Sequence, residues 1–227
     1  MIGHLPIATT ALALPFAAAL VLRWRKKRAA HLLWFALGIL CYGLGTALEA
    51  TITLRGSSIA LVKAWYVAGA LLGAWPLSQG TAYLLFRRRT ATTLAALLLP
   101  LVCLGTLLVI LSPVDESRLA PDRPSAAILT WTSARAFAPL INGYAALLLV
   151  GGAVVSARRF ARSGDAPQRA AGNALIAVGA LLPAIGGSIA RRGEVEALYV
   201  TEFFGLALIA AGYLLCIRAP AAELDGT

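Results

Sequence analysis

Seven long stretches of the chain contain almost no charged side chains, and this pattern limits the fold more than any other feature. They are residues 5–22, 31–52, 58–86, 92–111, 132–156, 170–190 and 197–217. A helix that crosses the hydrocarbon core of a bilayer needs about 20 mainly apolar residues, because the core is about 30 Å thick. A soluble chain with 59% hydrophobic and 13% charged residues would lack the polar surface that water requires. We therefore predict an all-α polytopic integral membrane protein, one domain over residues 1–227 with seven transmembrane helices.

The first apolar stretch is expected to remain as a helix instead of being removed as a signal peptide. The residues before it carry no lysine or arginine, and no small-residue cleavage pattern precedes Arg23. The positive charge follows the apolar stretch, whereas a signal peptide carries it in front. We therefore count this stretch as the first membrane span.

Lysine and arginine are unevenly distributed over the short connections, and this asymmetry predicts the orientation in the membrane. Alternate connections are strongly basic, with Arg23, Arg25, Lys26, Lys27, Arg28, Arg87, Arg88, Arg89, Arg158, Arg159, Arg162 and Arg169. The other connections hold Arg55, Arg118, Arg123, Arg191 and Arg192, mostly balanced by Asp115, Glu116, Asp122, Glu194 and Glu196. Basic connections remain in the cytoplasm. We expect the N-terminus outside, an outer loop over residues 112–131 and a short cytoplasmic tail over residues 218–227.

The net charge of +10 has the same explanation. The basic residues lie beside apolar stretches, where they face the headgroups of the bilayer. Anionic lipid headgroups are therefore the expected partner of these residues, and nucleic acid is not. The pattern indicates a multi-pass protein of a bacterial-type inner membrane.

Two groups of three stretches share short sequence patterns. Residues 36–40 are similar to 177–181, 65–67 to 198–200, and 83–85 to 213–215. One interpretation is a 3+1+3 pseudo-repeat, in which the fourth helix joins two parallel three-helix units. The other is chance similarity, because helices rich in Ala, Leu and Gly match easily.

Glycine and proline predict close packing and bends inside the spans. Gly69 and Gly73 form a small-xxx-small pattern, which favours close helix packing within the chain over a dimer face. Pro76, Pro100, Pro139 and Pro183 each remove one helical hydrogen bond. The stretch 179–187 around Pro183 is the best candidate for a broken helix.

Four ionisable residues lie inside the predicted spans, all toward the outer side: Glu49, Lys63, Arg135 and Glu202. A charge in hydrocarbon is costly and needs a partner, and two acids with two bases cancel. We predict an outward-facing polar cluster of these residues with Trp65, Tyr66, Trp131 and Tyr199. Two alternatives stay open. Lys63 and Arg135 can extend to the interface, and structural ion pairs explain the quartet as well as a ligand site does.

A second group of polar residues, without charge, lies deeper or toward the cytoplasm: Gln79, Tyr83, Asn142, Tyr144 and Asn173. The favoured interpretation is hydrogen bonding between neighbouring helices, at about 0.6–2 kcal/mol each. If both groups line one cavity, Gln79, Tyr83, Asn142 and Asn173 mark a polar path from the outer cluster inward.

Sequence features of catalysis, metal binding and cofactor binding are missing. His4 and His31 lie at opposite membrane faces, and Cys41, Cys103 and Cys216 are isolated in apolar stretches. No metal site and no cofactor are therefore expected. The seven spans resemble microbial rhodopsins in outline, but residues 197–217 contain no lysine for a retinal Schiff base. Glu49 and Glu202 are able in principle to exchange protons, yet an enzyme is the least supported class.

The leading hypothesis is a sensor or binding protein that holds a small or lipophilic ligand in an outward-facing polar pocket and signals to a partner. One alternative is a small-solute transporter in which two three-helix repeats rock against each other. The other is a structural subunit of a larger membrane complex. The partners left open are a small-molecule ligand, a second copy of the chain and another membrane protein.

Overall fold

The computed structural model describes residues 2–163, 167–190 and 192–218. Its long helices are α1 (Leu5–Lys27), α2 (Ala30–Arg55), α5 (Arg88–Leu111), α6 (Thr132–Ser163), α7 (Pro167–Ala190) and α8 (Val195–Arg218). The third span, Ile59–Leu85, consists of α3 (Ile59–Trp65), the π-helix η2 (Tyr66–Leu71) and α4 (Trp75–Leu85). Within the described residues, 7 helices are long and apolar enough to cross a membrane, which confirms the all-α prediction of seven spans. Residues 219–227 of the expected tail lie outside the described residues.

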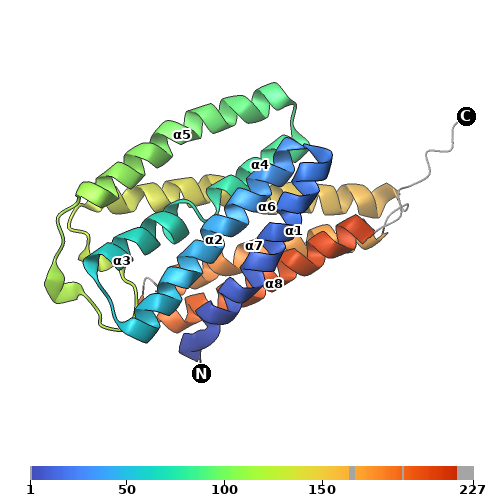
Figure 1. Cartoon of the computed structure of the whole chain (residues 1–227). Helices are drawn as coiled ribbons and strands as arrows, with labels where there is room; N and C mark the ends of the chain where they lie inside the picture. The colour runs from blue at the N-terminus through green and yellow to red at the C-terminus, as the bar shows by residue number, and fades with distance from the viewer. Residues whose placement is uncertain (1, 164–166, 191, 219–227) are drawn as a thin grey trace, which may run out of the picture.

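The helices form one bundle, in which α2 lies against α1 and against all three parts of the third span (Figure 1). Around the bundle, α4 packs against α6, α6 against α7, α7 against α8, and α8 against α1. Helix α5 lies at the edge and contacts α6, α4 and η2. The connection between α5 and α6 marks one end of the bundle, called the loop end below. The orientation of the loop end in the membrane stays a prediction.

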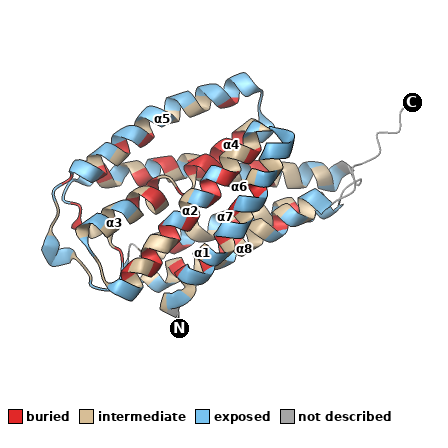
Figure 2. Cartoon of the chain, in the orientation of Figure 1, coloured by how far each residue is buried: buried red, intermediate tan, exposed pale blue. Residues whose placement is uncertain are grey.

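The surface of the bundle is apolar. Figure 2 shows the buried residues concentrated between the helices and the exposed residues along their outer faces. The exposed residues include large hydrophobic side chains such as Leu147 at 77% and Leu97 and Val155 at 62% each. Such a surface would associate in water, whereas lipid chains solvate it. The arrangement is therefore that of a bundle embedded in a bilayer.

Helices α7 and α8 are in close contact because glycines face backbone atoms of the opposite helix. A Cβ added at Gly179 would lie 2.6 Å from the Gly205 carbonyl oxygen, and one at Gly205 would lie 2.7 Å from the Gly179 carbonyl oxygen. Gly172 and Gly212 form a second reciprocal contact of the same kind. Lipid supplies no hydrophobic force between helices, so this close approach provides the dispersion contact that holds the pair together.

The break in a membrane helix lies in the third span and not in residues 179–187, so that prediction is wrong. Helix α7 continues through Pro183, whose ring packs opposite Gly205 of α8. In the third span, Pro76 has no N–H to donate, and it occupies the first turn of α4, where none is needed. The N–H of Gly73 donates to the Gly69 carbonyl at 3.1 Å as the π-helix ends. Three residues, 72–74, separate the two helical parts.

The loop of residues 112–131, predicted to lie outside, folds back onto the loop end of the bundle. The Ser57 N–H donates to the Pro121 carbonyl at 2.8 Å, which ties the α2–α3 connection to the loop. Ile128 and Leu129 are 1% exposed each and belong to the core. At its exposed side, Asp115 pairs with Arg118 at 2.8 Å. The hydrogen bond from the Ser117 hydroxyl holds the pKa of Asp115 below its ordinary value.

The proposed 3+1+3 repeat pairs the third span with α8. These two spans differ in the structure, because the third span is interrupted after Leu71 whereas α8 is continuous from Val195 to Arg218. The repeat therefore stays a prediction of the sequence patterns.

Candidate functional site

A buried glutamate on α2 is the centre of the polar group at the loop end. The Glu49 side chain is only 1% exposed, so its carboxyl group lies away from both water and lipid. The indole N–H of Trp65, the last residue of α3, donates to Glu49 Oε1 at 2.7 Å. This hydrogen bond joins α2 to the part of the third span that precedes the break.

A second carboxyl group faces Glu49 from α8. The carboxyl groups of Glu49 and Glu202 lie beside each other, and a hydrogen bond between two carboxyl groups requires a proton on one of them. The Tyr42 hydroxyl on α2 donates to the backbone carbonyl of Glu202 at 3.0 Å. Glu202 of α8 is therefore next to two residues of α2, Tyr42 and Glu49, which lie two helical turns apart.

Tyr199 lies on the same face of α8 as Glu202, three residues earlier. It is 4% exposed, and its hydroxyl lies beside the Thr53 hydroxyl without a hydrogen bond of standard geometry. We call Glu49, Trp65, Tyr199 and Glu202 the carboxyl site.

The two basic residues of the predicted cluster are not paired with the two acids. The Lys63 ammonium donates to the carbonyl oxygens of Ile110 at 2.8 Å and Ser112 at 2.9 Å, at the end of α5. Arg135 has a buried Nε without a hydrogen bond. Across residues 2–163, 167–190 and 192–218 the ion pair found is Asp115 with Arg118. The expectation of a charge-neutral quartet is therefore corrected: the carboxyl site contains both acids and neither base.

The aromatic residues of the predicted cluster divide in the same way. Trp65 and Tyr199 belong to the carboxyl site. The ring of Tyr66 packs edge-on against Trp65 at 6.1 Å, and its hydroxyl donates to the Arg135 carbonyl at 3.3 Å. Trp131 is 39% exposed at the start of α6, and its backbone N–H donates to the Ser112 hydroxyl. Trp131 therefore belongs to the loop and not to the site.

The uncharged polar residues join separate pairs of helices. The Gln79 amide donates to the Tyr144 hydroxyl at 2.8 Å, and the Asn142 amide donates to the Ala70 carbonyl at 3.0 Å, so both connect the third span to α6. The Asn173 amide donates to the Arg169 carbonyl and to Cys216 Sγ, which connects α7 to α8. Tyr83 bonds Thr92 on α5. Within the part of the chain that the structure describes, no hydrogen bond found joins these groups to the carboxyl site.

Tyr42 and Thr53 were not among the predicted site residues. Tyr42, Thr46, Glu49 and Thr53 follow one another at intervals of four, three and four residues, which places them on one face of α2. The Thr46 hydroxyl bonds the Thr10 hydroxyl of α1 at 2.9 Å. This polar stripe in an apolar helix is the signal that would have identified both residues.

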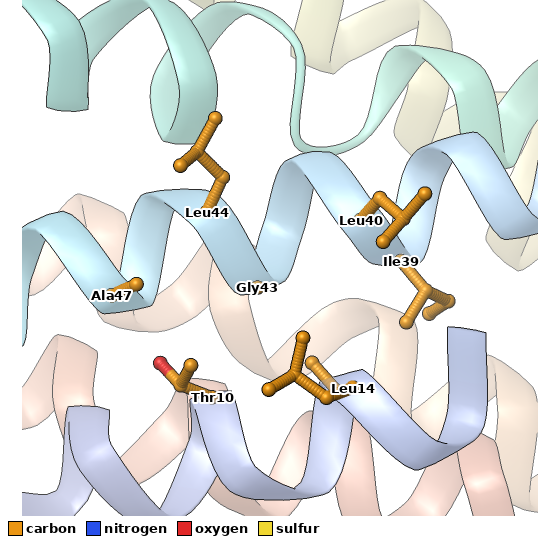
Figure 3. A pocket seen from close by; sticks show the side chains of 8 residues that line it. Thr10, Leu14, Ile39, Leu40, Gly43, Leu44 and Ala47 are labelled. Carbon is orange, nitrogen blue, oxygen red and sulfur yellow. The ribbon is translucent and has the colours of Figure 1, made fainter. Parts of the chain in front are cut away.

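The described cavities lie elsewhere. A groove of about 440 Å³ opens between α1 and α2, with Leu14 on one side and Leu40 and Leu44 on the other (Figure 3). A second groove of about 350 Å³ lies between α6 and α7 and is lined by five alanines and Arg158. Neither groove includes a residue of the carboxyl site. Within the described residues, no group of three metal-ligating side chains occurs.

The comparison with protein families identifies what kind of bundle this is. The family model described as "N-terminal 7TM region of histidine kinase" matches residues 6–219. No curated protein and no solved structure gives a match to the chain. The family match and the seven apolar helices establish a multi-pass membrane protein, consistent with a bacterial cell membrane. Because the match covers nearly the whole chain, the chain belongs to the N-terminal 7TM regions of histidine kinases, and its role is that of a seven-helix membrane sensor.

Proposed function

We propose that this sensor region recognises a small lipophilic ligand at the carboxyl site. The observation that carries the proposal is the Glu49 carboxyl group, 1% exposed, in contact with Trp65 and Glu202 and without a basic partner among the described residues. Ionisable groups inside a membrane bundle are costly, and they mark functional sites unless a structural partner explains them. Among the described residues, Lys63 bonds backbone carbonyls and Arg135 forms no ion pair, so these two bases do not neutralise the two acids.

The site also has the connections that a sensor needs. Its residues come from α2, from the segment of the third span before the break, and from α8. A ligand that changes the distance between Glu49 and Glu202 would shift α8 relative to α2. Helix α8 is the last span, and its far end lies at the opposite end of the bundle (Figure 1). The output would be passed from there to a histidine kinase, the protein class named by the family.

The geometry favours this role over transport. A transporter needs a continuous polar route across the bundle. The hydrogen bonds of Gln79 and Asn173 instead belong to two different pairs of helices, α4 with α6 and α7 with α8.

The test uses the full chain in lipid nanodiscs and three small lipophilic probes with the same octyl chain: octanol, octanoate and octylamine. Binding is measured from the indole N–H resonances of the chain labelled with [15N]tryptophan, in which Trp65 is assigned from the W65F spectrum. A ligand at the site is expected to shift the Trp65 resonance, because its N–H bonds Glu49. The variants E49Q and E202Q are expected to weaken that response. The matched control is E196Q, an exposed glutamate at the start of α8.

The proposal fails under either of two results. In the first, none of the three probes shifts the Trp65 resonance beyond the general effect of membrane partitioning, which the other indole resonances report. In the second, E49Q and E202Q leave both the response and the thermal unfolding midpoint of the chain unchanged.

A further inference from the structure

Three oxygen atoms in the carboxyl site have no hydrogen-bond partner among the described residues. Among the described residues, no N–H or O–H bonds Glu49 Oε2, Glu202 Oε2 or the Tyr199 hydroxyl oxygen. All three atoms are buried. A buried acceptor without a donor has given up its hydrogen bonds to water without a replacement, which costs free energy. Such atoms are therefore rare and need an explanation.

The three oxygens belong to side chains that face one another. The carboxyl groups of Glu49 and Glu202 are in direct contact, and Tyr199 lies one turn before Glu202 within the electrostatic range of both. The site therefore holds three unpartnered oxygens on neighbouring side chains, each with room for a further donor in its hydrogen-bonding capacity.

We propose that the group recognised at this site is a primary ammonium, the protonated amine of a lipophilic molecule. This inference rests on the proposed function and adds the chemical class of the ligand. A primary ammonium carries three N–H donors and no acceptor, which matches the three unpartnered oxygens. A hydroxyl group brings only one donor and would leave two oxygens unpartnered.

The charge of the site matches the same group. Two carboxyl groups that share one proton carry a single negative charge, which one ammonium neutralises without a second ion. The basic side chains of the region do not supply that charge, because Lys63 bonds backbone carbonyls and Arg135 forms no ion pair in the described structure. A charge-assisted hydrogen bond in a site without water is stronger than a neutral one.

The surroundings suit the hydrophobic part of such a molecule. The rings of Trp65 and Tyr199 border the acceptors, and aromatic faces attract organic cations. Glu202 is half-buried, not buried, so the site reaches the surface of the bundle along α8. An alkyl chain on that side of α8 would remain in the bilayer while the ammonium contacts Glu202.

The experiment compares three probes with the same octyl chain on the full chain in nanodiscs of phosphatidylcholine and phosphatidylglycerol. Octylamine has the charge and the donors, octyltrimethylammonium has the charge alone, and octanol has one donor and no charge. Titrations are read from the [15N] indole resonance of Trp65. Octylamine is expected to bind at least about tenfold more tightly than either of the others, the effect of one charge-assisted hydrogen bond.

Substitutions of the residues that carry the three oxygens test whether these oxygens cause the preference for octylamine. E49Q and E202Q are each expected to reduce the preference for octylamine by about tenfold or more, because each removes one carboxylate. Y199F removes the third oxygen with almost no change of shape, so it tests the proposal even if E49Q does not fold. E196Q is expected to keep the preference of the unaltered chain, since Glu196 is exposed and outside the site.

Nanodiscs with phosphatidylethanolamine separate two sources of the group, since that lipid carries a primary ammonium in its headgroup. A shift of the Trp65 resonance in these discs without octylamine, lost in Y199F, supports recognition of a lipid headgroup. Its absence together with octylamine binding supports a free amine.

Two results overturn the inference, and they are distinguishable. If octanol binds as tightly as octylamine and E49Q weakens both, the site binds ligands but does not select an ammonium. If no probe shifts the Trp65 resonance in a way that depends on Glu49, Tyr199 or Glu202, the proposed function fails as well.

Discussion

At the residue scale, the burial of a single carboxyl group determines the chemistry of this bundle. Glu49 is held by one hydrogen bond from the Trp65 indole and by its contact with Glu202. In lipid, water does not replace a lost partner, so each of these contacts determines whether the carboxyl group is tolerated in the core. The proposed recognition site is therefore also a sensitive point of stability.

The replacement Trp65→Phe removes the indole donor and leaves Glu49 Oε1 without its hydrogen bond. A buried acceptor that loses its donor costs about 1–3 kcal/mol, so W65F is expected to lower the free energy of unfolding by that amount. Reversible unfolding in mixed detergent micelles measures the change. The matched control is Trp131→Phe in the exposed part of the loop, where an effect within about 0.5 kcal/mol is expected. Equal losses in the two variants would contradict the role of the Trp65 hydrogen bond.

At the scale of elements, two features distinguish this bundle: the glycine contact of α7 with α8, and the interrupted third span. The glycine contact brings two backbones close and fixes α8 against α7. The interruption has the opposite effect, because it separates α3, which contributes Trp65, from α4. The close α7–α8 pair and the interrupted third span both contact the carboxyl site. This arrangement allows the part of the site on the third span to move relative to α7.

Gly179→Ala and Gly187→Ala test the close contact within one helix. The Cβ at position 179 would lie 2.6 Å from a backbone oxygen of α8, whereas nothing lies within 4 Å of a Cβ at position 187. We expect G179A to cost about 1–3 kcal/mol, the usual effect of overpacking. G187A is expected to be neutral or slightly stabilising, since alanine favours helix. Thermal unfolding of both variants in the same detergent gives the comparison, and a stable G179A would show that α7 and α8 separate easily.

Asn142→Leu tests the interruption of the third span. The Asn142 amide bonds the Ala70 carbonyl in the π-helix, and its loss is expected to cost about 0.6–2 kcal/mol. Hydrogen exchange is expected to accelerate in Tyr66–Leu71 and to stay unchanged in Trp75–Leu85, because the bond holds only the interrupted part. Uniform acceleration over both segments would instead indicate general destabilisation of the bundle.

At the scale of the whole molecule, the chain combines an apolar outer surface, a basic end and a loop end. The family match and the seven helices place it in a membrane as a sensor region. Which end faces outward follows only from the distribution of lysine and arginine. The carboxyl site lies near the loop end, so the orientation also determines which compartment the proposed ligand approaches from.

Cysteine labelling in whole bacterial cells tests this orientation. In a chain with Cys41, Cys103 and Cys216 replaced by alanine, Ser117→Cys places one thiol in the exposed outer loop. Thr90→Cys places one thiol beside Arg88 and Arg89 at the other end. A membrane-impermeant maleimide is expected to label S117C in intact cells and T90C only after permeabilisation. The reverse pattern would invert the predicted topology.

The sequence alone determined the class of the molecule, its seven spans and the acids of the site. Hydropathy is a sum over neighbouring residues, so a span is visible without knowledge of the fold. The partners of Glu49 were not visible in this way, since they depend on how far each helix is rotated and on which helix lies beside it. The tertiary structure packed α8 against α7 and α1 and brought Glu202 to Glu49, while Lys63 reached the end of α5.

The position of the broken helix has the same explanation. Residues 179–187 and the third span both contain proline and glycine, so the local sequence does not indicate which of the two is interrupted. Packing between helices decides it. Helix α7 continues through Pro183 because Gly205 of α8 leaves room for the proline ring. The third span is interrupted where Asn142 of α6 bonds the Ala70 carbonyl. The composition of each span thus follows from the sequence, whereas its shape and its polar contacts follow from the neighbours that surround it.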